Sequence, residues 1–185
     1  QNMPLVHIQG GEVPGNIEEK VRHANTKLAD IHIVSSEDAK ERVIKLGEDP
    51  SKVFTTGCPS IDWARIVFDS PDLDFDPLLK YRGVGSDISW KNGYIVVMQH
   101  PVTTEFSDSI KHVRQLLTIV DKLNIPTFWF WPNVDAGSDG TSSGIRQYRE
   151  VYNPNNIHFF KNMEPNDFLK LILNSKWLVG NSSVG

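Results

Sequence analysis

The first segment with residues suited to chemistry spans residues 7–23. It places Gly10 and Gly11 after an apolar run, and then Glu18 and Arg22 four positions apart. Glycine lets a backbone approach a ligand closely, and a carboxylate can accept or donate a proton in catalysis. A Glu–Arg pair at this spacing also forms an ordinary surface ion pair on a helix. The segment is therefore compatible with a catalytic loop and with a solvated helix end.

A histidine marks the second segment. His100 comes directly after an expected strand at residues 94–99 and just before Pro101. Imidazole can act as an acid or as a base near neutral pH. A histidine that merely ends a strand with a satisfied hydrogen bond would fit this position as well, so both interpretations stay open.

Two further segments, residues 131–138 and residues 180–185, also follow apolar runs. The first suits an ordinary turn as well as a binding loop. The second offers small residues between a strand and a helix, where N–H groups and hydroxyls either bind a phosphate or cap the helix. The polar residues of the two segments are Asn133, Asp135, Ser138, Asn181, Ser182 and Ser183.

The remaining histidines and the cysteine carry weaker signals. His23 follows Arg22 and could face a ligand from the same helix, whereas His32 and His158 lie in apolar runs and are expected in the core. The single cysteine, Cys58, excludes a disulfide framework and a cysteine-based zinc site. The alternating aspartates of residues 72–76 lack the glycine and glutamate of a calcium loop, so no metal is predicted.

Short apolar runs alternate with longer amphipathic runs, which is typical of an α/β fold with a parallel sheet. Several strands are continuously apolar, as expected when both faces of a sheet are covered. The expected strands span residues 4–8, 31–34, 53–55, 94–99, 127–131, 157–160 and 177–179. The expected helices span residues 18–28, 37–46, 60–68, 107–122, 144–152 and 165–174.

A stretch rich in Pro, Gly and Asp interrupts this alternation. We predict a linker at residues 71–92, with a short helix near residues 77–82, between α/β units at residues 1–70 and 93–185. Ligands of open α/β sheets bind at the carboxyl ends of the strands, where the four polar segments also fall.

Composition narrows the possible partners. The 185 residues hold 19 basic and 23 acidic side chains, for a net charge of −4, which argues against a broad nucleic-acid surface. No apolar run reaches the roughly 18 residues that a membrane span needs, and we expect no signal peptide. A lone thiol fits a reducing compartment. We therefore expect a cytoplasmic protein without nucleic-acid or membrane partners.

Five strings together resemble the UDP-N-acetylglucosamine 2-epimerases in order and approximate spacing. They are HIQGGEVPGNIEEKVRHANTKLADIH, TTGCPSID, QHPVTTE, PNVDAGS and GNSSVG. The string QHPVTTE is similar to the corresponding segment of the hydrolysing branch, whose enzymes act in the biosynthesis of sialic acid and related nonulosonates. The resemblance covers essentially the whole chain.

The resemblance implies a GT-B fold, in which two Rossmann-like domains enclose an active-site cleft. The chain would be the second half of the first domain and the first half of the second. A catalytic aspartate would precede Gln1, and residues that hold ribose and diphosphate would follow Gly185. The resemblance also suggests a homodimer or a homotetramer.

The family's reaction is an elimination: UDP leaves carbon 1 as the proton of carbon 2 is removed, and water then adds to the glycal to release a manno-configured sugar. The resemblance implies catalytic roles for Glu18, Arg22 and His100, without a metal or a cofactor. The implied UDP-sugar-binding residues are Gly10, Gly11, His23, Asn133, Asp135, Ser138, Asn181, Ser182 and Ser183.

Gln9 departs from the pattern, because many relatives carry Glu there and an amide cannot act as a general base. Three explanations stay open: a subfamily acting on UDP-2,4-diacetamido-2,4,6-trideoxyglucose, an engineered inactivating change, or Glu12 as the substitute base. Two alternatives to the epimerase also stay open. One is a GT-B glycosyltransferase with a UDP-sugar donor, and the other is a catalytically disabled UDP-sugar-binding module.

Overall fold

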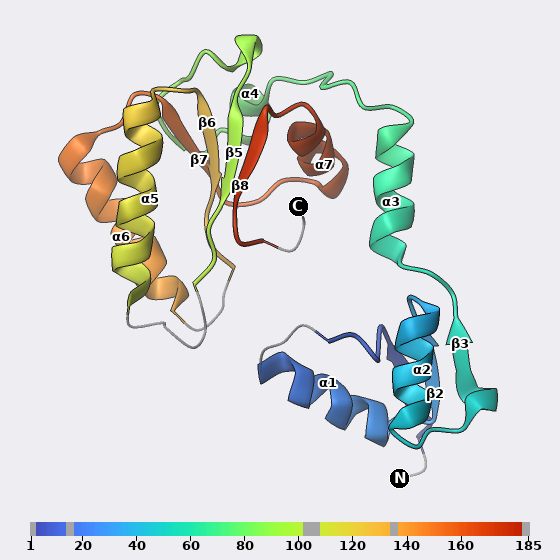
Figure 1. Ribbon diagram of the computed structural model, residues 1–185. Helices are drawn as coiled ribbons and strands as arrows, with labels where there is room; N and C mark the ends of the chain where they lie inside the picture. Colours follow the sequence, from blue (N-terminus) through green and yellow to red (C-terminus); the bar gives the residue numbers. More distant parts are fainter. Residues whose placement is uncertain (1–2, 14–16, 102–107, 134–136, 183–185) are drawn as a thin grey trace. The chain divides into compact units, whose positions relative to one another are not determined.

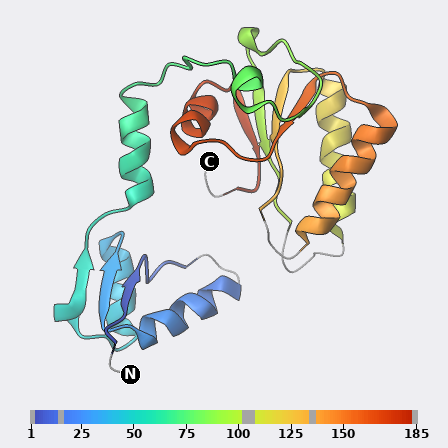
Figure 2. The same cartoon turned by 180° about the vertical axis from the view of Figure 1, so that it is seen from behind.

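The computed structural model describes residues 3–13, 17–101, 108–133 and 137–182. The chain divides into two compact units, Gln1–Ile66 and Val67–Gly185, each described separately below. The division falls near the end of helix α3 (Pro59–Phe68). Both units place helices beside a sheet (Figure 1, and Figure 2 from behind).

Unit 1 holds a parallel sheet in the order β1-β2-β3. Its core is formed by Val34, Ala39, Val43 and Val53. Its elements are β1 (Val6–Ile8), α1 (Ile17–Leu28), β2 (Ile31–Val34), α2 (Glu37–Lys45), the short 3-10 helix η1 (Pro50–Lys52) and β3 (Val53–Thr55).

Helix α2 illustrates how the local sequence sets an element. The Ser36 side chain accepts a hydrogen bond from the Ala39 N–H, and Glu37 and Asp38 lie in the first turn, near the positive end of the helix dipole. Ala39 and Val43 are buried on one face. These signals predicted the start of the helix from the sequence.

An ion-pair cluster holds α1 against the segment that follows α2. Glu48 accepts from Lys27 Nζ at 2.5 Å, and its second oxygen lies 3.2 Å from Nε2 of the buried His32. The hydrogen bond from Lys27, with the charge of Lys27 and the contact with His32, holds the pKa of Glu48 below its usual value. The cluster therefore favours the ionised carboxylate in the folded state.

We expect the stabilisation from Glu48 to depend on pH. Since its pKa is lowered by folding, the contribution is complete above the unfolded value of about 4.3 and is lost as the pH falls through the lower folded value. Glu48→Gln should cost about 1 kcal/mol of unfolding free energy at pH 7. Urea unfolding at pH 7 and pH 3 should show the difference from wild type shrinking in acid. Glu41→Gln, which breaks only the exposed pair with Lys45, should change little; an equal Glu48→Gln penalty at both pH values would contradict the account.

Unit 2 holds a sheet in the order β4-β7-β6-β5-β8, in which only the β4–β7 pair is antiparallel among the described strands. Its strands are β4 (Val84–Gly85), β5 (Ile95–Met98), β6 (Thr127–Phe130), β7 (Ile157–Phe160) and β8 (Trp177–Gly180). Its helices are α4 (Pro77–Tyr81), η2 (Trp90–Asn92), α5 (Ser109–Leu123), α6 (Ser138–Tyr152) and α7 (Pro165–Leu173).

Helices cover both faces of this sheet (Figure 1). Helices α5 and α6 pack on one face, where Trp129 and Phe159 meet Leu117 and Ile145. On the other face, a second apolar cluster includes Phe128 from β6 and Leu171 from α7. The central strands are buried along almost their whole length, which confirms the two-sided cover predicted from their continuous apolar runs.

The stretch at residues 71–92, predicted as a linker, does more than connect. Its short helix is present as α4, and Leu73, Ile88 and Trp90 pack into the apolar cluster of unit 2. Its strand β4 pairs with β7, an element that the sequence did not predict because two residues carry no periodicity. Helix α6 also begins at Ser138 rather than at residue 144.

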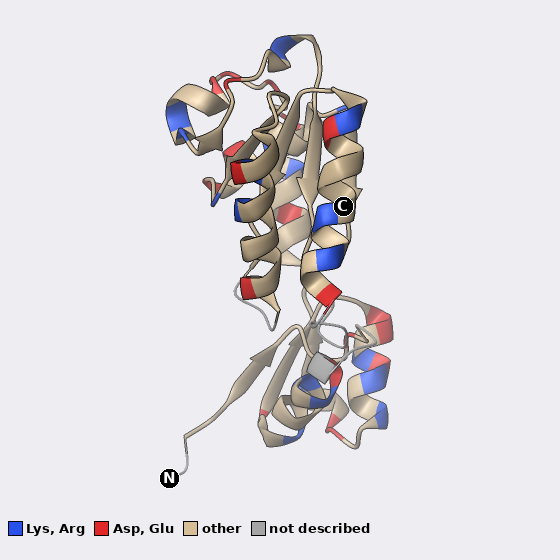
Figure 3. Ribbon diagram, turned by 90° about the vertical axis from the view of Figure 1, so that its left-hand side faces the viewer, with Lys and Arg blue, Asp and Glu red and all other residues tan. Residues whose placement is uncertain are grey.

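Neither sign of charge dominates the helices. Basic and acidic side chains are interspersed along the helices in the view of Figure 3. Among the described residues, none of the helices combines the length and the apolar character that crossing a membrane requires.

Candidate functional site

The turn after β1 is packed tightly against the rest of unit 1. Both Gly10 and Gly11 are buried. A Cβ on Gly11 would lie 2.3 Å from the Ala39 carbonyl oxygen of α2, and a Cβ on Gly10 would lie 3.0 Å from His7 Nδ1. The close approach that these glycines permit is therefore to the protein's own residues, and their predicted contact with a ligand stays a prediction.

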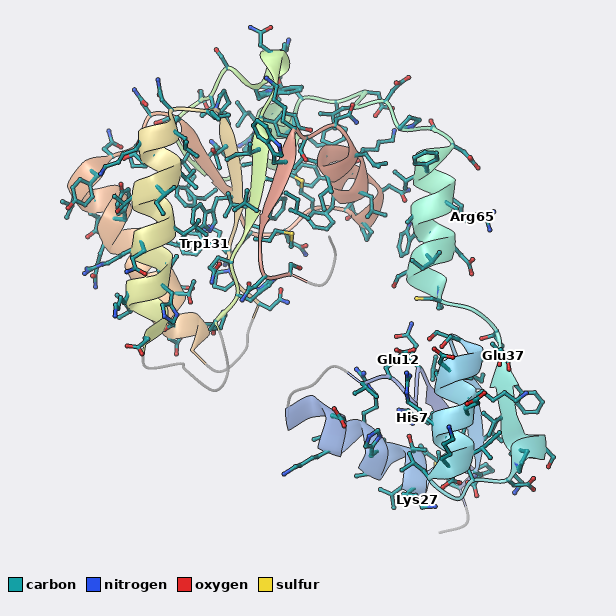
Figure 4. All side chains as sticks on the ribbon, in the orientation of Figure 1. His7, Glu12, Lys27, Glu37, Arg65 and Trp131 are labelled. Carbon is teal, nitrogen blue, oxygen red and sulfur yellow. The ribbon has the colours of Figure 1, made fainter. Side chains whose placement is uncertain are left out.

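Gln9 and Glu12 are both held by neighbouring side chains. Gln9 Nε2 donates a weak hydrogen bond to Cys58 Sγ at 3.5 Å. The Ser35 hydroxyl donates to Glu12 Oε1. Glu12 and His7 both lie in the region between α1 and α2 (Figure 4). His7, Gln9 and Glu12 therefore lie in β1 or shortly after it, each with a polar side-chain partner.

His7 is linked to α1 by a hydrogen bond between its Nδ1 and the hydroxyl of Thr26, at 3.1 Å. Thr26 is fully buried, and its hydroxyl donates to the Arg22 carbonyl oxygen at 3.1 Å. Burial, together with the neighbouring His32 and Arg22, lowers the pKa of His7. The sequence analysis did not single out His7, since nothing in the sequence reveals the contact with Thr26, nineteen positions away.

The other predicted residues of unit 1 lie on α1. Glu18 falls in the first turn of the helix, but its side chain is outside the described residues, while Arg22 is half-buried. His23 Nε2 lies 3.6 Å from Glu19 Oε1, so its nearest charged partner is on its own helix.

In unit 2, three strand ends meet at His100. The His100 N–H donates to Asn181 Oδ1 at 2.8 Å, and Asn181 Nδ2 donates to the His100 carbonyl oxygen at 3.0 Å. The backbone N–H of Asn133 donates to His100 Nδ1 at 3.4 Å. Strand β5 lies between β6 and β8, and this order brings the three residues together. Asp135 and Ser183 lie outside the described residues.

The contact with Asn133 determines which nitrogen of His100 carries the proton. Since Nδ1 accepts a hydrogen bond, the neutral ring must carry its hydrogen on Nε2. His100 therefore presents an N–H donor that suits an anionic oxygen or the delivery of a proton.

A hollow of about 980 Å³ lies beside this cluster, at the carboxyl ends of β6 and β7. Asn133 and Ser138 line it, as do three cations that the sequence analysis missed: Arg146, Arg149 and Lys161. The Arg146 guanidinium lies 5.8 Å from the ring centre of Trp131, labelled in Figure 4. The spacing of Arg146 and Arg149 on one helix was the available signal. The carboxylate of Asp139 also lines the hollow, so the three cations leave an excess of positive charge that suits an anionic ligand.

Gly180 allows β8 to lie against β5 just before Asn181. Its φ is 142°, and a Cβ would lie 2.0 Å from the Met98 carbonyl oxygen. Gly180→Ala should therefore lower the unfolding free energy by about 3 kcal/mol, measured by urea unfolding. Gly57→Ala is the matched control, because Gly57 also has positive φ but no atom lies within 4 Å of the added Cβ. Equal losses in the two variants would show that the contact with Met98 is not the cause.

The chain was compared with known proteins. The family model described as UDP-N-acetylglucosamine 2-epimerase matches residues 1–185. The chain is 31% identical over 192 residues to the UDP-N,N'-diacetylbacillosamine 2-epimerase (hydrolyzing) of Legionella pneumophila, covering all of this chain and 46% of that protein. It is 32% identical over 187 residues to polysialic acid biosynthesis protein P7 of Escherichia coli, covering all of this chain and 45% of that protein. The chain thus spans about half the length of these curated relatives.

Solved structures match at the level of the fold. The UDP-GlcNAc 2-epimerase of Neisseria meningitidis bound to UDP-GlcNAc aligns with a TM-score of 0.72 at 17% identity, covering 100% of this chain and 49% of that chain. The UDP-N-acetylglucosamine 2-epimerase of Rickettsia bellii aligns with a TM-score of 0.64 at 16% identity, covering 97% and 45%. These matches confirm the predicted fold class, an α/β chain of GT-B type with parallel sheets.

Proposed function

Since the chain belongs to the UDP-N-acetylglucosamine 2-epimerase family, we propose that it forms part of a hydrolysing UDP-sugar 2-epimerase. The relatives named as hydrolysing 2-epimerases, from Legionella pneumophila and Campylobacter jejuni, support the hydrolysing branch. The product would be a free manno-configured N-acetyl sugar for nonulosonate biosynthesis.

The observation that carries this proposal is the hydrogen-bonded cluster of His100, Asn133 and Asn181. A departing diphosphate develops negative charge, and a fixed N–H donor stabilises such charge most when it is already oriented. Nε2–H of His100 is such a donor. We assign the diphosphate to the vicinity of His100, Asn181 and Ser182, with Ser183 and the predicted uridine-side residues Asn133, Asp135 and Ser138 as further contacts.

The same assignment gives roles to residues of unit 1. Glu18 is the proposed catalytic carboxylate, Arg22 its cationic neighbour one turn later, and Gly10, Gly11 and His23 the proposed sugar-side contacts. A GT-B arrangement would bring these residues to one cleft with His100. The cytoplasmic location and a homodimer or homotetramer stay predictions.

Two substrates are candidates. The relatives from Legionella and Campylobacter carry names that refer to diacetylbacillosamine, the 2,4-diacetamido-2,4,6-trideoxy sugar. The relative from Neisseria meningitidis, 28% identical, is named for UDP-N-acetylglucosamine. Gln9 in place of the usual Glu would fit a subfamily that acts on the diacetamido sugar, and the names of these relatives are what supports that substrate.

The test uses the full-length protein with each UDP-sugar and no acceptor. Release of UDP is measured, and the sugar product is identified by NMR. A free manno-configured sugar from one substrate supports the proposal and selects that substrate. UDP release that requires an acceptor would indicate a glycosyltransferase. Binding without any release would indicate a disabled binding module.

A further inference from the structure

The hollow at the carboxyl ends of β6 and β7 carries positive charge that the proposed function does not use. Its charged lining residues are Arg146, Arg149, Lys161 and Asp139, so three cations and one carboxylate leave a net charge of +2. Among the described residues, the ion pairs all involve other side chains than these four. The charge of the three cations is therefore available to a ligand.

The two arginines of the hollow are placed by aromatic rings. They lie three positions apart on α6, so they share a face of the helix. The Cζ atom of Arg146 lies 5.8 Å from the ring centre of Trp131, and that of Arg149 lies 5.5 Å from the ring centre of Phe159. A ring face attracts a guanidinium, while the N–H groups at the guanidinium edge can still donate. The planar fork of donors in arginine matches the oxygens of a phosphate.

The cations of the hollow lie away from the place assigned to the substrate diphosphate. This step rests on the proposed function, which puts the diphosphate beside His100 and Asn181. Asn181 follows β8 and Lys161 follows β7, with β5 and β6 between these two strands. Neighbouring strands lie about 4.8 Å apart, so the ends of β7 and β8 are about 14 Å apart. The uridine assigned to Asn133 and Ser138 is neutral at pH 7, so it does not account for the cations either.

We propose that the hollow is a second anion site, which binds a phosphate monoester while the substrate diphosphate occupies its own place. A phosphate monoester carries a charge of about −1.5 to −2 at pH 7, which matches the net charge of the lining. The volume of about 980 Å³ is at the upper end for ligand pockets, so it leaves room for the organic group of the ester. Trp131 and Phe159, which also line the hollow, offer apolar contact to that group.

The test is calorimetric titration of the full-length protein with inorganic phosphate and with phenyl phosphate, each with and without saturating UDP. Both probes should bind. Phenyl phosphate should bind more tightly, because its ring adds apolar contact. Saturating UDP should change the Kd of either probe by less than about threefold, since the two sites are separate.

Three variants connect the binding to the hollow. Arg149→Gln should weaken the binding of phenyl phosphate by about tenfold or more, because a charge-assisted hydrogen bond is lost. Asp139→Asn should strengthen it, because a negative charge leaves the lining. Arg114→Gln is the matched control: Arg114 lies on α5, donates to Gln147 and does not line the hollow, so the Kd should not change. Retained binding of UDP checks that each variant folds.

The outcomes separate this inference from the proposed function. Phosphate binding that disappears in the presence of UDP would make the hollow a part of the substrate site. An equal loss in Arg149→Gln and Arg114→Gln would trace the binding to general surface charge. Either result would overturn the second site, as would the absence of binding of both probes to the wild type. A wild type that releases no UDP would overturn the proposed function alone, because the titrations without UDP still test the anion site.

Discussion

Replacing His100 with alanine should lower the rate of UDP release by about 100-fold or more in the full-length protein. The reason is the loss of the Nε2–H donor, which the contact between Asn133 and Nδ1 orients. A donor fixed before the reaction stabilises the leaving diphosphate without any reorganisation. The measurement is kcat from a UDP-release assay at saturating UDP-sugar.

Two further variants define what His100 does. His100→Gln keeps an N–H donor but cannot give up a proton, so a loss equal to that of alanine would indicate proton transfer. A milder loss would indicate hydrogen bonding to the diphosphate. His112→Ala is the comparison variant, because His112 lies in the first turn of α5 and has no role in the proposed site, and it should leave the rate unchanged. A nearly normal rate in His100→Ala would remove His100 from the mechanism.

Glu18→Gln is expected to reduce turnover by about 100-fold or more as well. The substitution keeps the size of the side chain and removes its ability to carry a proton or a negative charge. Glu18 lies in the first turn of α1, where the helix dipole favours the ionised carboxylate. The measurement is again UDP release, with the product followed by NMR to detect any change in the sugar.

Glu19→Gln provides the control for Glu18→Gln on the adjacent position. Glu19 lies 3.6 Å from His23, one of the proposed sugar-side residues, so its loss should affect the rate only through His23 and by far less than the loss of Glu18. Equal losses in the two variants would mean that the charge of this helix end matters rather than the Glu18 carboxylate itself.

Most elements of the fold could be predicted, because local composition defines them. Strands β2, β3 and β7 span the predicted residues, since each apolar run is bounded by turn-forming or polar residues. The start of α6 could not be predicted, because Ser, Gly and Thr favour helices weakly. The added turns pack on α5: a Cβ on Gly140 would meet the Ser109 side chain, and a Cβ on Gly144 would lie 2.5 Å from Val113 Cγ1, so both glycines let α6 approach α5.

The individual residues of the candidate site could be predicted from the sequence, but the contacts between them could not. The loops after the strands were identifiable from His100, Asn133 and Asn181 as polar residues following apolar runs. Their mutual contacts depend on the order β8-β5-β6, which no local pattern encodes. The link from His7 to Thr26 likewise joins residues on two different elements, and only the folded chain brings them together.

Asn181 holds both backbone polar groups of His100, so its amide adds one more rung to the ladder between β5 and β8. The histidine backbone is thereby ordered as part of the sheet before any ligand arrives. Ordering one residue's backbone costs about 1–2 kcal/mol in conformational entropy. Because the backbone of His100 is already ordered in the folded protein, substrate binding does not lose this conformational entropy.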